Sequence, residues 1–173
     1  LPMLAADPQY PHDPYIIAAL KEAIAAAKAG NFGVGAVLVS ARGEVLEKGQ
    51  NRVFQPYFRS DLHAEMDVMT RFEERNRKFQ RLGECTLYTS LEPCPMCLAR
   101  LIVAGVGEVF YAAADPEGGM IQGLERLPVL WARMAQGRNR VQPRHPSCQR
   151  SSVAIPYKNN VGSIQITPMP PTY

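Results

Sequence analysis

The stretch Thr86-Leu87-Tyr88-Thr89-Ser90-Leu91-Glu92-Pro93-Cys94-Pro95-Met96-Cys97 decides the fold of this chain. It predicts a short strand that stops at Glu92-Pro93 and turns directly into a helix beginning near Cys94. Pro95 suits the first helical turn, because the amide hydrogen that it lacks has no intrahelical partner there and its φ is already helical. Two cysteines three residues apart then lie side by side at a helix N-terminus, where the helix dipole favours thiolates. Such a pair is either a redox couple or two ligands of a metal ion.

A second pattern upstream favours the metal. The segment Asp61-Leu62-His63-Ala64-Glu65 opens another helix and places His63 and Glu65 in its first turn. One imidazole and two thiolates make three ligands, which leaves the fourth tetrahedral position of Zn²⁺ open for water. Glu65 lies only two residues from His63, so we expect it to reach that water rather than to bind the metal. The pattern predicts a catalytic zinc site.

Two other interpretations of the cysteine pair compete with this one. A lone Cys-x-x-Cys is often part of a structural zinc site or a redox motif. A closed structural site needs a fourth ligand, and the spare candidates do not lie at ligand spacing; they are Cys85, Cys148, His12 and His145. Neither interpretation gives Glu65 a role.

Length and composition indicate an ordinary globular protein. A chain of 173 residues is most simply one domain, and no apolar run approaches the roughly 18–20 residues of a membrane span. Four cysteines, two of them assigned to a metal, fit a reducing compartment, so we expect a cytoplasmic protein without membrane contact. The sequence starts at Leu1 and leaves open whether an N-terminal targeting segment has been removed.

Charge is distributed unevenly along the chain. All 16 acidic residues lie at or before Glu125, and seven arginines and lysines follow it. A basic segment of this kind can follow the phosphates of RNA, so RNA is a candidate partner of the Arg-rich C-terminal segment. The alternative is a solvated tail whose arginines keep it soluble.

Hydrophobic periodicity predicts an alternating α/β order. Each expected element is a segment with apolar residues at helical or strand spacing, and turn or cap residues bound it. They are a helix from its N-cap Asp13 to Gly30, a buried strand Phe32–Val39, its antiparallel partner Glu44–Gly49, a helix from its cap Asp61 to about Arg77, a buried strand Val106–Ala113 parallel to the cysteine strand, and a helix Leu124–Ala135. A short strand at Ser151–Ile155 is also expected.

Loops at the ends of these strands supply further candidates. Asn51 either terminates a turn or points its carboxamide at a ligand. The loop Val53–Ser60 carries three aromatic residues and is expected to wall a pocket. Asp115 begins a loop at the C-terminal end of a strand, where open α/β sheets hold their ligands.

From Asp13 to Ala135 the chain resembles the cytidine-deaminase superfamily. The resemblance rests on Gly49-Gln50-Asn51, on His63-Ala64-Glu65 and on Leu87 through Cys97, which are similar to bacterial guanine deaminases and tRNA adenosine deaminases. It implies a three-layer α/β/α fold around a five-stranded mixed sheet, and usually a homodimer. By position it implies zinc on His63, Cys94 and Cys97 and a proton shuttle at Glu65. It also implies substrate contacts, which fall on Asn51, the Ala64 backbone, Phe32 and Asp115.

Two positions depart from these groups. Leu91 stands where guanine deaminases have a cysteine, and it is closer to the tRNA enzymes. Glu117-Gly118-Gly119 stands where the tRNA enzymes usually have a basic residue and a Gly-Ala pair.

The sequence therefore predicts a zinc-dependent deaminase that replaces an amino group of a nucleobase with oxygen. A free purine such as guanine is the first candidate substrate. The alternatives are adenosine in tRNA, converted to inosine, and a non-catalytic structural zinc protein. We expect an N-terminal arm at residues 1–12, a deaminase domain at 13–136 and a basic, proline-containing segment at 137–173.

Overall fold

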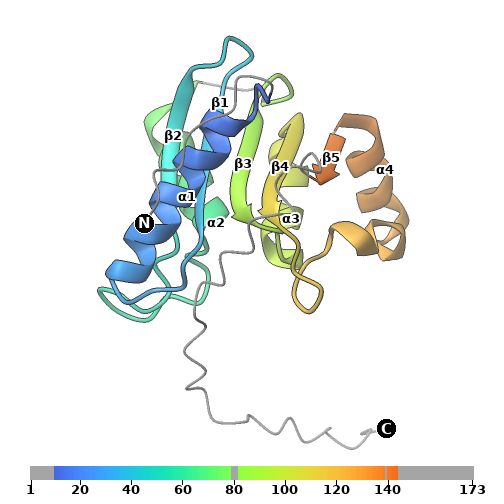
Figure 1. Ribbon diagram of the computed structural model, residues 1–173. Coiled ribbons are helices and arrows are strands. Elements are labelled where there is room, and N and C mark those ends of the chain that lie inside the picture. Colours follow the sequence, from blue (N-terminus) through green and yellow to red (C-terminus); the bar gives the residue numbers. More distant parts are fainter. Residues whose placement is uncertain (1–9, 79–81, 139, 144–173) are drawn as a thin grey trace, which may run out of the picture.

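The computed structural model describes residues 10–78, 82–138 and 140–143 (Figure 1). Its elements in chain order are α1 (Asp13–Lys28), β1 (Gly35–Val39), β2 (Val45–Gln50), α2 (Ala64–Arg75), β3 (Thr86–Leu91), α3 (Pro95–Ala104), β4 (Glu108–Ala113), the 3₁₀ helix η1 (Ile121–Arg126), α4 (Val129–Arg138) and β5 (Arg140–Pro143). Within these residues, none of the helices has the length and apolar character needed to cross a bilayer. The strand expected at Ser151–Ile155 and most of the Arg-rich segment lie outside the described residues.

The five strands form one mixed sheet in the order β2-β1-β3-β4-β5. β1 runs antiparallel to both β2 and β3, whereas β3, β4 and β5 run parallel to one another. The parallel β3 and β4 are joined through α3, which is the strand–helix–strand unit that the sequence predicted. The five-stranded mixed sheet expected from the resemblance is confirmed.

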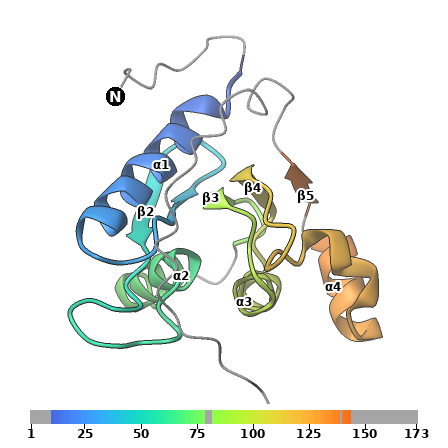
Figure 2. The same ribbon diagram turned by 60° about the horizontal axis from the view of Figure 1, so that its bottom comes forward.

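Helices cover both faces of the sheet (Figures 1 and 2). On one face α1 packs Ile16 against Val37, Tyr88 and Phe110. On the other face α2 and α3 pack Val68, Met69 and Leu101 against the opposite side chains of β1 and β3. α4 lies against α3 at one end of the molecule, where Leu98 and Ile102 contact its residues. The three layers of the predicted α/β/α fold are therefore present.

Close packing at β1 depends on a residue without a side chain. All five residues of β1 are buried, as the continuous apolar run predicted. A Cβ atom on Gly35 would lie 2.3 Å from the carbonyl oxygen of Ala19 and 2.4 Å from the amide nitrogen of Ala23. Only glycine therefore allows α1 to lie this close to the start of β1.

Two predicted helix caps are wrong. Asp13 is the first residue of α1, and His12 occupies the N-cap position without a side-chain hydrogen bond. Asp61 does not cap α2, because its carboxylate is held by two hydrogen bonds from the Arg59 guanidinium, at 2.8 and 2.7 Å. The N-cap of α2 is His63 itself.

The single helix predicted over Leu124–Ala135 is also wrong. The chain forms η1 first and then starts α4 after Pro128. The residue before a proline is disfavoured in the helical region, and Leu127 is accordingly extended, with φ −67° and ψ 150°. β5 follows α4 and was not anticipated; it pairs with β4 beyond the expected domain end at residue 136.

Candidate metal centre and active site

Three predicted ligands meet at one end of the sheet. His63 is the N-cap of α2 and Cys94 is the N-cap of α3, so both stand where a helix begins. Cys97 follows one turn into α3 and is fully buried. The ligand atoms of these three residues all lie within 4.8 Å of one another, and His63 Nδ1 is 3.5 Å from Cys94 Sγ. A nitrogen and two sulfur ligands at this spacing fit Zn²⁺, which prefers imidazole and thiolate.

Electrostatics within the cluster favour a thiolate at Cys94. A hydrogen bond from Cys97 lowers the pKa of Cys94 to about 4, and the same bond raises the pKa of Cys97 well above its usual range. The hydrogen bond with Cys94 raises the pKa of His63. Because metal ions bind thiolate and neutral imidazole, a cation here displaces the protons that these groups otherwise share.

Glu65 lies beside the cluster but outside the ligand set. It is the second residue of α2 and only 3% exposed. Thr89 of β3 donates a hydrogen bond of 3.2 Å to its Oε1. Burial raises the pKa of the Glu65 carboxyl group above its ordinary value. The geometry therefore places a buried carboxyl group next to three residues that could hold a metal ion.

Asn51 and Ala64 line the same end of the molecule. Asn51 follows β2 and is buried; its Oδ1 accepts a hydrogen bond of 3.1 Å from the Val53 amide. Its carboxamide oxygen thus has the turn-forming role that the sequence left open. Ala64 is the first residue of α2, and the amide hydrogens of a first helical turn have no intrahelical partner. Asn51 thus lies just after the end of β2, and Ala64 directly follows the predicted ligand His63.

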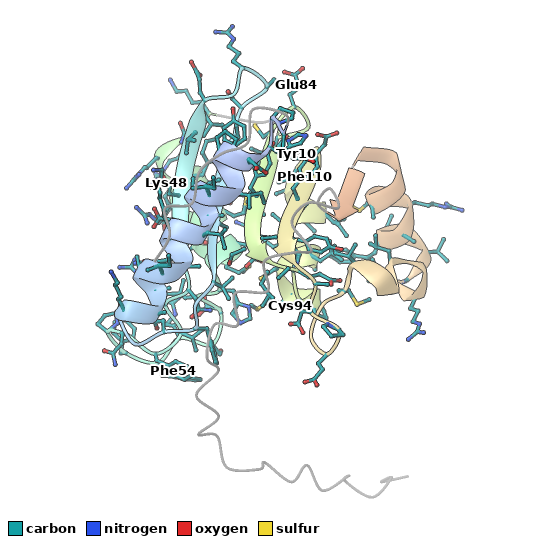
Figure 3. All side chains as sticks on the ribbon, viewed as in Figure 1. Tyr10, Lys48, Phe54, Glu84, Cys94 and Phe110 are labelled. Carbon is teal, nitrogen blue, oxygen red and sulfur yellow. The ribbon has the colours of Figure 1, made fainter. Side chains whose placement is uncertain are left out.

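Phe32 belongs to an aromatic group rather than to the metal cluster. Its half-buried ring contacts that of Phe54, with 5.0 Å between ring centroids. Phe54 lies in the loop between β2 and α2, and Figure 3 shows it at the same end of the sheet as Cys94. The loop that was expected to wall a pocket is therefore at the metal end of the molecule.

Asp115 is engaged in its own turn. Its Oδ1 accepts hydrogen bonds from the amides of Glu117, at 3.2 Å, and Gly118, at 2.9 Å. Its own amide donates to Glu92 Oε2 at 3.0 Å. The structure brings His63, Cys94, Cys97 and Glu65 together, whereas it ties Asp115 into a neighbouring loop.

Glu92 is a residue that the sequence reasoning missed. It is 3% exposed, and each oxygen of its carboxylate accepts one backbone hydrogen bond, from Asp115 and from Ile121, both at 3.0 Å. These bonds hold the loop between β4 and η1 against the turn that carries Cys94. A charged residue at the end of an apolar strand was the available signal, because buried carboxylates are rare unless they are hydrogen-bonded.

Comparison with known proteins agrees with this geometry. The family described as the cytidine and deoxycytidylate deaminase zinc-binding region matches residues 11–113. The chain is 39% identical over 105 residues to the tRNA-specific adenosine deaminase of Bacillus subtilis, covering 61% of this chain and 63% of that protein. It is 33% identical over 102 residues to the guanine deaminase of the same organism, covering 59% of this chain and 64% of that protein. A solved structure from a study of A-to-I editing by tRNA:A34 deaminases superposes with a TM-score of 0.60 at 32% identity, covering 67% of this chain and 89% of that chain.

The chain spans less than two thirds of the length of these curated relatives. It spans 20% of a tRNA(Ile)-lysidine synthase of Deinococcus radiodurans, to which it is 37% identical over 123 residues, or 68% of this chain. The family pattern, by contrast, covers more than half of the chain and includes the sheet from β1 to β4, the three ligands and Glu65. The chain therefore belongs to the family of the cytidine and deoxycytidylate deaminase zinc-binding region.

Proposed function

We propose that this chain is a zinc-dependent hydrolytic deaminase, which replaces the exocyclic amino group of a nucleobase with oxygen and releases ammonia. One observation carries the proposal: a buried carboxyl group, Glu65, stands beside three metal ligands without being one of them. A structural zinc site gives such a carboxyl group no task, whereas hydrolysis needs a group that moves protons at the reacting atoms.

The residues divide the chemistry between them. His63, Cys94 and Cys97 would hold zinc, which leaves one position for water and lowers the pKa of that water toward about 7. Glu65 would take a proton from the attacking water and pass it to a ring nitrogen, so that the ring carbon accepts the oxygen. Glu65 would then take the second proton of that water, from the oxygen now bonded to the ring carbon, and carry it to the amine, which leaves as ammonia when the carbon–nitrogen bond breaks. Thr89 would hold the carboxyl group in place through its hydrogen bond to Oε1.

Substrate contacts are assigned to groups around this centre. The Asn51 carboxamide nitrogen and the backbone amide of Ala64 are the proposed polar contacts, and Phe32 is the proposed wall for the base. These groups fit a planar ring with donors and acceptors on its edge. Asp115 stays a predicted contact with the substrate. In the structure its Oδ1 already accepts two hydrogen bonds from its own loop.

Two forms of substrate are candidates. A free purine such as guanine is supported by the guanine deaminase relative. Adenosine within tRNA is supported by the tRNA-specific relative and by the superposition on a tRNA:A34 deaminase. Ammonia release from a panel of free bases and nucleosides, run beside a tRNA anticodon stem-loop at low and moderate salt, separates the two. Turnover of RNA that fades with salt indicates the second, because phosphate contacts are screened.

Glu65→Gln tests the chemical role. We expect this variant to keep its zinc and to lose ammonia release on every substrate that the wild-type protein uses. Glu74→Gln, which removes an exposed carboxylate from the same helix, is the matched control and should keep both properties. Loss of zinc from Glu65→Gln would contradict the assignment of Glu65 as a proton carrier. A wild-type protein with one zinc and no activity on any amino-substituted base would favour the non-catalytic alternative.

Two further expectations stay predictions. A homodimer is tested by the molar mass of the zinc-loaded protein in solution. Removal of residues 144–173 tests the Arg-rich segment as an RNA contact, since its loss should weaken RNA binding and reduce the dependence of that binding on salt.

A further inference from the structure

An exposed aromatic surface lies on the loop that leads into the metal centre. Residues 52–62 connect β2 to α2, and we call them the aromatic loop. Three of their side chains are exposed aromatic rings: Phe54 at 39%, Tyr57 at 64% and Phe58 at 69%. Large apolar side chains gathered on a surface usually mark a site of binding.

The aromatic loop is held in a defined shape. The Asn31 side-chain oxygen accepts hydrogen bonds from the backbone amides of Phe54, at 2.8 Å, and Gln55, at 3.0 Å. The base of the loop is closed where the Arg52 amide donates to the Leu62 carbonyl at 2.9 Å. A second bond, from the Arg59 amide to the Val53 carbonyl at 2.8 Å, closes it further out. The rings are therefore presented by an anchored frame, which lowers the entropy lost when a ligand binds them.

The rings form a series that leads outward from the proposed base wall. Phe32 is half-buried and lies 5.0 Å from Phe54, and Phe54 lies 6.3 Å from Phe58, measured between ring centroids. The last ring of the series is also the most exposed. The loop continues directly into His63, and Figure 3 shows Phe54 at the same end of the sheet as Cys94.

Cationic groups lie among these rings. The side chains of Arg52 and Arg59 are each 43% exposed. Asp61 accepts hydrogen bonds from Nε and Nη2 of Arg59, and the Tyr57 side chain also interacts with Arg59, so this guanidinium is held beside an exposed ring of the loop. The Arg52 guanidinium lies 3.8 Å from a carboxylate oxygen of Asp67, which is a long distance for an ion pair. Exposed rings interleaved with arginines are typical of surfaces that bind unpaired nucleic-acid strands, where bases stack on the rings and phosphates contact the cations.

We propose that the aromatic loop is a stacking platform for the unpaired nucleotides next to the target base, with Phe58 as its outer ring. This inference rests on the proposed function, since it places the target base at Phe32 and its strand neighbours further out. A free base would reach only the inner ring and would leave the exposed rings without a ligand. A strand of nucleotides engages the whole series.

Binding of a fluorescein-labelled single-stranded RNA of about 12 nucleotides to the zinc-loaded protein tests the platform. Fluorescence anisotropy would give the dissociation constants of the wild type, Phe58→Leu and Phe58→Trp. Leucine keeps an apolar side chain but removes the π face, so it separates base stacking from an ordinary apolar contact. Leu130→Ala is the matched control, because Leu130 is an exposed apolar side chain of α4.

We expect Phe58→Leu to weaken RNA binding about tenfold, and Phe58→Trp and Leu130→Ala to bind like the wild type. Equal affinity for the wild type and Phe58→Leu, an equal loss in Leu130→Ala, or no RNA binding by the wild type would overturn the platform. Ammonia release is measured on the same preparations. Release from free bases without RNA binding overturns only the platform, whereas RNA binding through Phe58 without any ammonia release overturns the proposed function and leaves the platform standing.

Discussion

Replacing Glu92 with glutamine should destabilise the protein although the two side chains have nearly the same shape. In the structure both carboxylate oxygens accept a backbone hydrogen bond of 3.0 Å, one from Asp115 and one from Ile121. Glutamine has one acceptor oxygen, so its NH₂ group must face one of these two backbone amides. Two hydrogen-bond donors then face each other and no hydrogen bond forms between them. The side chain is 3% exposed, so water has little access to replace the lost acceptor.

The magnitude follows from the two bonds. A hydrogen bond to a charged group contributes about 1.5–3 kcal/mol, and a buried amide left without an acceptor costs a similar amount. Glu92→Gln keeps one bond, in weakened neutral form, and loses the other. We therefore expect the free energy of unfolding to fall by about 2–3 kcal/mol. No cavity is created, so the change reports on the hydrogen bonds alone.

Urea unfolding of the zinc-loaded protein, followed by circular dichroism, measures this change. Glu117→Gln is the matched control, because Glu117 is an exposed carboxylate in the same loop, and it should alter stability by less than about 0.5 kcal/mol. Gly119→Ala perturbs the same two hydrogen bonds from the loop side, because a Cβ atom at this position would lie 2.4 Å from Glu92 Cδ. This variant should also lower the free energy of unfolding. If Glu92→Gln unfolds at the same urea concentration as Glu117→Gln, the two backbone bonds do not stabilise the loop and the reasoning fails.

Three other predictions concern packing and the metal. Gly35→Ala should lower stability by about 3 kcal/mol in thermal unfolding, because the new methyl group would overlap the backbone of α1 at Ala19; a wild-type melting temperature would contradict the packing. After zinc removal, iodoacetamide at neutral pH should label Cys94, whose pKa is lowered to about 4, and spare Cys85, whose pKa is raised by burial; peptide mass spectrometry reads both sites, and zinc should prevent the labelling of Cys94. Zinc affinity, measured by competition with a chromophoric chelator, should fall as pH is lowered. Because the hydrogen bond with Cys94 raises the pKa of His63, the proton should begin to compete for Nδ1 above the ordinary histidine pKa of about 6.5, and an affinity that stays constant through that range would oppose this.

The elements around the metal centre could be predicted because their signals are local and strong. Pro95 stands in the first turn of α3 as expected, and Gly105 ends the helix with a left-handed φ of 71°. β1 was recognised from its continuous apolar run. The proximity of His63, Cys94 and Cys97 followed from the chemistry of three ligands and one open position, and the structure brings them together.

What could not be predicted depends on contacts between distant segments. Asp61 looked like a helix cap because aspartate is favoured there, but Arg59 competes for its carboxylate. Glu92 contacts amides 23 and 29 residues further along the chain, and sequence patterns say little about such pairs. β5 has only four residues and is defined by its pairing with β4 rather than by its own composition.

The positions of the two ligand-bearing helix starts connect stability with function. N-cap positions usually carry serine, threonine, aspartate or asparagine, whose side chains satisfy free amide hydrogens of the first turn, and losing such a cap costs about 1 kcal/mol. α2 and α3 instead have His63 and Cys94 there, and neither side chain makes a capping hydrogen bond. The fold thus gives up two caps and gains two metal ligands at the positive ends of two helix dipoles, which favour the thiolate that the metal needs. Zinc would then restore part of that stability by joining the two helix starts, so metal binding and the stability of α2 and α3 are coupled through the same two residues.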